Sequence, residues 1–238
     1  QTAQVTAHTN EKLPMYNIIA SFDSAKKDRV LLAAHWDTRP NADQDTDKSK
    51  QNDPIDGAND GGSGVGVLLE IAQHLHDKSP TVGVDIILFD VEDYGGYKAE
   101  DSFCLGSQYW SKNKHLPNYT AKYGILLDMV GAADAIFLKE PISLRYAPSV
   151  VDNVWRTAKK LGYDTYFKNQ TSYNPITDDH KYVNEIAKIP MIDIIHYTPQ
   201  GNFGDFWHTH SDNITIIDQG ALKAVGQTVL QVIYNEGN

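Results

Sequence analysis

Short runs of hydrophobic residues alternate with amphipathic segments along most of the chain. Runs of four to eight apolar residues bounded by turn residues are typical of buried strands, and we predict strands at 15–22, 29–34, 84–89, 123–127, 135–138 and 190–195. Apolar residues recur at helical spacing in 63–77, 148–161 and 218–234. Strands that alternate with helices predict an α/β fold with a mixed, mostly parallel central sheet flanked by helices.

The longest polar stretch of the chain lies between two of these elements. Residues 40–56 are rich in Asp, Asn, Gln and Lys, and the segments on both sides have strong strand or helix patterns. Such a stretch is typical of a surface loop rather than of a domain linker. We therefore expect residues 1–238 to form a single domain.

Polar side chains that can bind metals follow several predicted strands at the point where each strand ends. In open α/β sheets, ligands bind outside the carboxyl ends of the strands. Adjacent residues in an extended segment point in opposite directions, so two neighbouring acids can serve two tasks, one at a metal and one in proton transfer. The candidates at strand ends are His35 with Asp37, Glu92 with Asp93, Asp128 and His196.

Two further candidates lie in glycine-containing loops. Asp60 is part of G-A-N-D-G-G-S-G, just before the helix predicted at 63–77, and His208 is part of W-H-T-H-S-D, before the last helix. Each has an ordinary structural explanation, since an Asp before a helix is normally a cap and a lone His normally packs or lies at the surface. Their occurrence together with acids at successive strand ends favours a site.

Composition narrows the classes of function. The chain has 238 residues, of which 41% are hydrophobic, and its formal charge of −10 argues against nucleic acid as a partner. No apolar stretch is long enough to span a bilayer. The single cysteine, Cys104, excludes an intrachain disulfide and a cysteine-rich metal site. A metal would therefore be held by imidazole and carboxylate groups, a set that suits zinc.

These motifs together resemble a known enzyme family. H-W-D, G-A-N-D-G-G-S-G-V, I-L-F-D-V-E-D, L-L-D-M-V-G-A, D-D-H and W-H-T-H-S-D occur in the same order in the M28-like zinc aminopeptidases. They resemble still more the single-zinc relatives of these peptidases, the glutaminyl cyclases (glutaminyl-peptide cyclotransferases). The resemblance runs from about Arg29 to the C-terminus and implies a zinc-exopeptidase-like fold.

The resemblance implies roles for the matching residues. In the cyclases, the residues that match Asp60, Asp93 and His208 hold one zinc ion, and Glu92 matches the residue that transfers protons. Asp128 matches a hydrogen-bonding residue near the reacting group. In the aminopeptidases, His35 and Asp128 match ligands of a second zinc, and Asp60 matches a bridging ligand.

Three details favour a cyclase over a peptidase. The sequence has Asp178-Asp179-His180 where the peptidases usually have S-D-H, and Asp178 matches a residue of the cyclases' proton network. Trp207 precedes His208 as in the cyclases, and L-L-D-M-V-G-A resembles their version closely. Tyr97 falls where a pocket tryptophan occurs, so Trp207 and Tyr97 are expected to bind the substrate.

Two positions depart from the pattern. Position 93 is Asp where both groups typically have Glu, and Asp193 stands where the animal cyclases have His. His35 is retained, so a second metal site is not removed. The aminopeptidase with two zinc ions remains the alternative function, and a non-catalytic binding domain on the same frame is a further one.

The expected function is conversion of an N-terminal glutamine of a peptide to pyroglutamate with release of ammonia. Zinc would polarise the γ-carbonyl, and Glu92 would shuttle the proton. The partners would be peptides or proteins with a free N-terminus. The resemblance also implies a periplasmic or secreted location, although the polar first residues show no signal-peptide pattern.

Overall fold

A five-stranded sheet forms the centre of the protein, a computed structural model that describes residues 1–237. The strand order is β3-β5-β4-β6-β9; β3 runs antiparallel to β5, and the other strands are mutually parallel. The α/β fold with a mixed, mostly parallel sheet is therefore confirmed. The strands of this sheet are β3 (Ile18–Phe22), β4 (Arg29–His35), β5 (Gly83–Phe89), β6 (Tyr123–Asp128) and β9 (Met191–Ile195).

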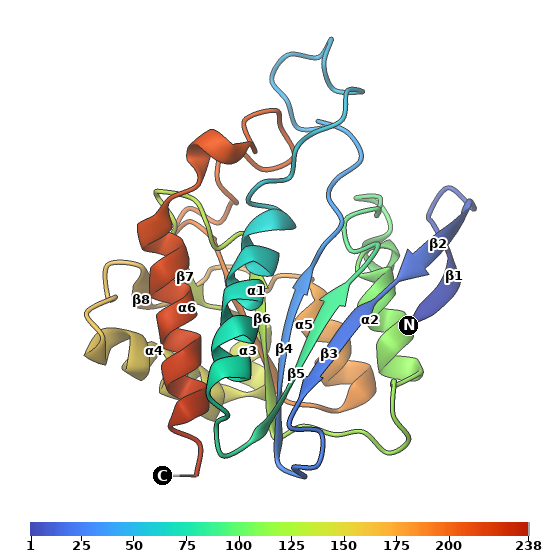
Figure 1. Cartoon of the computed structure of the whole chain (residues 1–238). Coiled ribbons are helices and arrows are strands. Elements are labelled where there is room, and N and C mark those ends of the chain that lie inside the picture. The colour runs from blue at the N-terminus through green and yellow to red at the C-terminus, as the bar shows by residue number, and fades with distance from the viewer. Residues whose placement is uncertain (238) are drawn as a thin grey trace.

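Helices cover both faces of this sheet (Figure 1). One face packs against α1 (Gly62–Asp77), α4 (Pro148–Lys160) and α6 (Gln219–Tyr234) through the largest hydrophobic cluster. The other face packs against α2 (Leu105–Lys112) and the π-helical turn η2 (Val183–Ala187), which continues the short helix α5 (Asp179–Tyr182). Burial on both faces explains why β4, β5, β6 and β9 are almost continuously apolar.

The parallel strands end at one edge of the sheet, below the loop of residues 38–56 that rises at the top of Figure 1. Helix α1 starts at this edge and lies very close to the sheet at Gly64. A Cβ atom on Gly64 would lie 2.3 Å from the carbonyl oxygen of Leu127 and 2.9 Å from Cβ of Ala34. The missing side chain thus allows the start of α1, and Asp60 just before it, to lie beside the ends of β4 and β6.

Some predicted elements are shorter than expected, or divided. The strand predicted at 15–22 is two strands, since β2 (Lys12–Tyr16) pairs with β1 (Thr2–Thr6) in a separate hairpin, whereas β3 joins the main sheet. Of 135–138, only the end is in β7 (Phe137–Lys139), which pairs with β8 (Phe167–Thr171). Strand β8, the helix α3 (Pro141–Tyr146), α2, α5 and the 3-10 turns η1 (Glu100–Ser102) and η3 (Ile214–Ile216) were not predicted.

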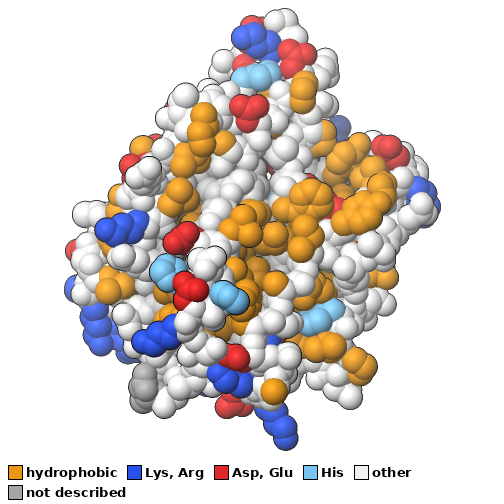
Figure 2. Space-filling view, viewed as in Figure 1, with side chains coloured by type: hydrophobic (Ala, Val, Ile, Leu, Met, Phe, Trp, Pro, Cys, Tyr) orange, Lys and Arg blue, Asp and Glu red, His pale blue; other side chains and the backbone are white. Residues whose placement is uncertain are grey.

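The surface on the α1 side carries exposed hydrophobic residues as well as charges. Figure 2 shows hydrophobic side chains gathered over the region of α1 and β3, with acidic and basic side chains scattered around them. Tyr16, Ile18 and Trp36 are exposed, and the Trp36 indole donates a hydrogen bond to the carbonyl of Tyr16. Among residues 1–237, no helix has both the length and the apolar character that crossing a bilayer requires.

An ion pair is buried at the opposite edge of the sheet. The Arg29 guanidinium donates two hydrogen bonds to Asp85, from Nε at 2.6 Å and from Nη2 at 2.8 Å, and Tyr119 and Ser21 also donate to this carboxylate. Burial alone would raise the pKa of Asp85, but these hydrogen bonds lower it below its ordinary value. The network ties the start of β4 to the start of β5.

We predict that Arg29→Met lowers the free energy of unfolding by about 3–5 kcal/mol at pH 7, since Asp85 would remain buried without its cation. The folded-state pKa of Asp85 is depressed, so its contribution to stability is present above about pH 4 and is lost as the pH falls through that pKa. The difference between the two proteins should therefore narrow in acid. Urea unfolding at several pH values measures it.

Arg145→Met is the matched control, because Arg145 is exposed on α3. An equal loss of stability in both variants would contradict a special role for the buried pair.

Candidate active site

A cavity of about 440 Å³ opens at the carboxyl edge of the sheet. This volume lies within the range typical of small-molecule sites. Every residue that we predicted as a catalytic, substrate-binding or first-metal residue contributes to its lining. These residues are Asp60, Glu92, Asp93, Tyr97, Asp128, Asp178, Trp207 and His208.

Asp60, Asp93 and His208 form a compact group of possible metal ligands. Their ligand atoms all lie within 4.8 Å of one another, and His208 Nε2 is 3.0 Å from Asp93 Oδ2 and 3.5 Å from Asp60 Oδ2. Within the described residues, Asp93 Oδ2 is buried and makes no hydrogen bond of normal geometry. The lone pairs of the two carboxylates and the imidazole converge on one point, where a cation could bind all three. One imidazole with two carboxylates is a ligand set that suits zinc. Although the Asp93 side chain is shorter than the glutamate typical of both enzyme groups, its carboxylate reaches the other two ligands.

Asp60 is positioned by backbone hydrogen bonds rather than by acting as a helix cap. The Asp212 carboxylate accepts from the backbone N–H groups of Asn59 at 2.7 Å and Asp60 at 3.0 Å. Helix α1 is capped by Gly61, which has a φ of 98°. A left-handed glycine there lets the chain turn sharply before α1, so that the Asp60 side chain stays at the site. The ordinary explanation of Asp60 as a cap is therefore wrong.

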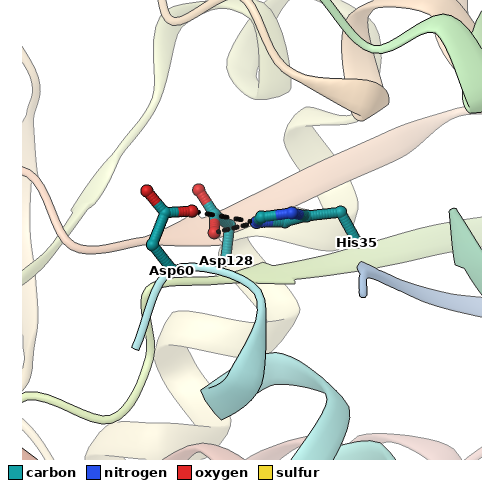
Figure 3. Close-up of side chains that lie close together, drawn as sticks. All are labelled: His35, Asp60 and Asp128. Carbon is teal, nitrogen blue, oxygen red and sulfur yellow. Dashed lines mark hydrogen bonds and ion pairs between the residues drawn. The ribbon is translucent and has the colours of Figure 1, made fainter. Parts of the chain in front are cut away.

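The imidazole of His35 points toward the carboxylates of Asp60 and Asp128, which both lie at its Nε2 atom (Figure 3). Its Nε2 is 3.0 Å from Asp128 Oδ1 and 3.1 Å from Asp60 Oδ1. Burial alone would lower the pKa of His35, but hydrogen bonds with Asp128, Asp37 and Asp60 raise it well above its ordinary value. Asp37 also accepts hydrogen bonds from the backbone N–H groups of Glu92 and Asp93. The second-metal candidates His35 and Asp128 thus meet at Asp60.

Glu92 contributes to the lining of the same cavity. Burial raises the pKa of Glu92 well above its ordinary value, and the neighbouring carboxylates of Asp93 and Asp178 act in the same direction. The buried Cys104 thiol donates to Glu92 Oε1 at 3.0 Å. A carboxyl group with a raised pKa can both accept and return a proton near neutral pH.

Further buried acids surround Glu92. Burial raises the pKa of Asp128 to about 7, although the hydrogen bond from His35 opposes this. Burial also raises the pKa of Asp178, which accepts a hydrogen bond from the backbone N–H of Asp179 as the cap of α5. Asp193, from the middle of β9, is buried beside Asp178 and has a pKa well above its ordinary value, because of burial first and then the charges of Asp178 and Asp128. A proton shared among these acids relieves their repulsion.

Aromatic side chains form the outer wall of the cavity. The Trp207 ring stacks on His208 with centroids 3.9 Å apart, and Tyr97 contacts Trp207 edge-on at 6.1 Å. Phe203 packs on the far side of Trp207 at 4.9 Å. Trp207 and Tyr97 therefore both border the cavity, and Tyr97 also has a polar contact that we did not predict, since its hydroxyl lies 2.8 Å from His208 Nδ1.

Several residues around the site were missed in the sequence. Asp43, in the loop that we interpreted as ordinary surface, lies 3.4 Å from His208 Nδ1. Asp212 could have been suspected, because it belongs to the W-H-T-H-S-D motif. No sequence signal indicated the contact of Cys104 with Glu92, and Asp193 stood out only as a departure from the motif pattern, without a predicted role. The strand-end candidate His196 does not contribute to the cavity lining. The same is true of His8, His74, His76, His115 and His210.

Many solved structures resemble this protein, and three of them illustrate the similarity over nearly its whole length. A Zn-dependent exopeptidase from Parabacteroides distasonis is 54% identical, with a TM-score of 0.96 over 99% of this chain and 83% of that one. The glutaminyl cyclase of Porphyromonas gingivalis is 51% identical, with a TM-score of 0.95 over 98% and 81%. That of Bacteroides thetaiotaomicron, bound to N-acetylhistamine, is 50% identical, with a TM-score of 0.97 over 99% and 82%.

Curated relatives and a family model place the chain more broadly. It is 29% identical over 125 residues to the uncharacterized protein YfbL of Escherichia coli and 27% identical over 218 residues to the aminopeptidase YwaD of Bacillus subtilis. It spans 34% and 41% of their lengths, and the matches cover 51% and 87% of this chain. The model of peptidase family M28 matches residues 17–233. The chain therefore belongs to peptidase family M28 and, within it, to the group that contains the bacterial glutaminyl cyclases.

Proposed function

We propose that this protein is a zinc-dependent glutaminyl cyclase, which converts an N-terminal glutamine to pyroglutamate and releases ammonia. The observation that carries the proposal is one cavity that joins a zinc-type ligand group to a set of protonatable carboxyl groups, Glu92, Asp128 and Asp178. The identity of about 50% to named glutaminyl cyclases supports the same function. The substrates are peptides or proteins with a free N-terminus, because the reaction needs an unblocked α-amine.

The metal group consists of Asp60, Asp93 and His208. When bound there, zinc would supply a Lewis acid that polarises the γ-carbonyl of the substrate glutamine. Glu92 accepts the proton that the α-amine loses as its nitrogen bonds to the carbonyl carbon of the side-chain amide. Glu92 then returns that proton to the amide nitrogen, the bond from this nitrogen to the carbonyl carbon breaks, and ammonia leaves.

Asp128 and Asp178 hold the substrate amide during this exchange. A protonated carboxyl group donates a hydrogen bond and an ionised one accepts, so a network that shares protons can bind both the amide and the departing ammonia. The pKa of about 7 for Asp128 suits this task at neutral pH. Asp193 takes the place of the histidine of the animal cyclases, and its buried carboxyl group supplies a proton to Asp178.

Trp207 and Tyr97 pack the flat glutaminyl side chain against the aromatic wall. Holding amine and amide in contact contributes the proximity that cyclisation requires. The ring stacked on His208 also limits the space in which water could approach the reacting carbonyl.

The alternative is an aminopeptidase with two zinc ions, and the contacts of His35 favour it. His35, Asp128 and Asp60 form a second group of possible ligands within 4.8 Å. In the cyclase, His35 instead donates a hydrogen bond to Asp128 or Asp60 and fixes these carboxylates. Because the proposed cyclisation needs only one Lewis acid to polarise the amide carbonyl, we propose one zinc ion per chain. We also propose a periplasmic or secreted location, which cell fractionation of the native organism would test.

We predict that the protein releases ammonia from peptides that begin with glutamine, and that Glu92→Gln lowers kcat by about 10²–10⁴-fold because the proton acceptor is lost. Ammonia release and mass spectrometry of the peptide measure the reaction, beside a panel of aminoacyl substrates. Glu70→Gln, an exposed acid on α1, is the matched control and should leave the rate unchanged. Hydrolysis of the panel without cyclisation would contradict the proposed function.

Elemental analysis should find one zinc ion per chain. His208→Ala should remove it, since the only imidazole of the proposed metal group is lost, whereas His35→Asn should retain it. Two zinc ions in the parent protein, one of them lost in His35→Asn, would instead support the aminopeptidase.

A further inference from the structure

The side of His208 that faces away from the metal group is held by a chain of hydrogen bonds. His208 Nδ1 lies 2.8 Å from the Tyr97 hydroxyl, and this hydroxyl lies 3.1 Å from Asp43 Oδ1. Asp43 Oδ2 accepts from Arg39 Nε at 3.0 Å and Nη2 at 2.6 Å. The four residues come from three distant segments of the chain and meet at one edge of the cavity.

The direction of every hydrogen bond in this chain is determined by chemistry. A metal on His208 Nε2 requires a proton on Nδ1, so Nδ1 must donate. Arg39 can only donate, so Asp43 is the acceptor at the far end. The Tyr97 hydroxyl can both donate and accept a hydrogen bond, and here it accepts from His208 Nδ1 and donates to Asp43. All donors and acceptors match with His208 in the tautomer that leaves Nε2 free for a metal.

Arg39 also holds the second ligand of the metal group. Its Nη1 donates to the backbone carbonyls of Asp93 at 2.8 Å and Gly95 at 2.7 Å. The Arg39 guanidinium lies 5.1 Å from the centre of the Tyr97 ring, a distance typical of a cation–π contact. The Arg39 side chain is only 11% exposed. The Arg39 side chain therefore fixes both the loop that carries Asp93 and the carboxylate of Asp43, the final acceptor of the hydrogen bonds that start at His208.

We propose that Tyr97, Asp43 and Arg39 are positioning residues that set the affinity for zinc, by holding His208 in the metal-binding tautomer and orientation. The inference rests on the metal group of the proposed function. Outer partners of a metal-bound histidine typically contribute 10–100-fold in metal affinity. The loop of residues 40–56 thus takes part in the site through Asp43.

Tyr97 has two separable contributions. Its ring borders the substrate cavity, and its hydroxyl belongs to the hydrogen-bond chain. A tryptophan at this position would present an indole N–H that only donates, so it could not accept a hydrogen bond from His208 Nδ1. Tyr97→Phe removes the hydroxyl and keeps the ring, and therefore isolates the positioning role.

The test measures zinc affinity by competition between the full chain and a chromogenic chelator, with zinc alone and no substrate. Tyr97→Phe and Asp43→Ala should each weaken zinc binding by about 10–100-fold. The double variant should bind zinc only slightly more weakly than the single variant with the lower zinc affinity. Both substitutions break the same series of hydrogen bonds. Asp43→Asn, which keeps the shape of the side chain, serves if Asp43→Ala does not fold.

Two matched controls change residues of the same types that do not belong to the hydrogen-bonded group of His208, Tyr97, Asp43 and Arg39. Tyr173→Phe changes a tyrosine that is 84% exposed, and Asp45→Ala changes an acid of the same loop that contacts His210 instead. Both should bind zinc as the parent does. Zinc affinities of Tyr97→Phe and Asp43→Ala within twofold of the parent would overturn the proposal, even if KM rises in Tyr97→Phe. A parent that binds zinc but does not cyclise glutamine would overturn the proposed function alone.

Discussion

Repulsion among buried carboxyl groups is the constraint on which this site depends. Asp60, Asp93, Asp128, Asp178 and Asp193 are all buried near one edge of the sheet. Ionised carboxylates are costly to bury unless cations or shared protons compensate them. His35 and His208 lie among them, and the pKa values of Asp93 and Asp128 rise to about 6 and 7. Shared protons, and a zinc ion when one is bound, would offset this cost, and both are also what the proposed chemistry uses.

The sheet and the main helices could be predicted because local pattern and tertiary environment agree. Strands buried on both faces must be apolar throughout, and β4, β5, β6 and β9 have that pattern. The polar residues that end these strands then had only one edge at which to meet. The strand pattern was therefore enough to place Glu92 and Asp128 at one cavity, whereas Asp60 and His208, which lie in loops, were assigned to the site from the motifs shared with the zinc enzymes. The roles assigned to them, and the single domain 1–238, stay predictions.

The supporting contacts could not be predicted, since they join residues with no shared motif. Asp43 lies in a polar loop whose composition is typical of solvent exposure, and its partners at the site, Tyr97 and His208, are 54 and 165 residues away. Asp193 is part of the apolar strand pattern, and only the packing of α5 against β9 brings it near Asp178, the N-cap of α5. Val91, Met129 and His208 adopt left-handed backbone angles directly beside or at the site, with φ of 54°, 47° and 54°. Such strained angles are uncommon for these residue types, and no local pattern indicates them.

The close approach of α1 to the sheet at Gly64 has a consequence for how the family can vary. Even a single methyl group there would push the helix away from β4 and β6, and Asp60 would move with it, away from both histidines. The distance between the shared carboxylate and the strand ends is therefore encoded by the absence of a side chain. Substitutions can accumulate in the loops that shape the cavity mouth, whereas this contact admits almost no change, so specificity can diverge while the metal group stays in place.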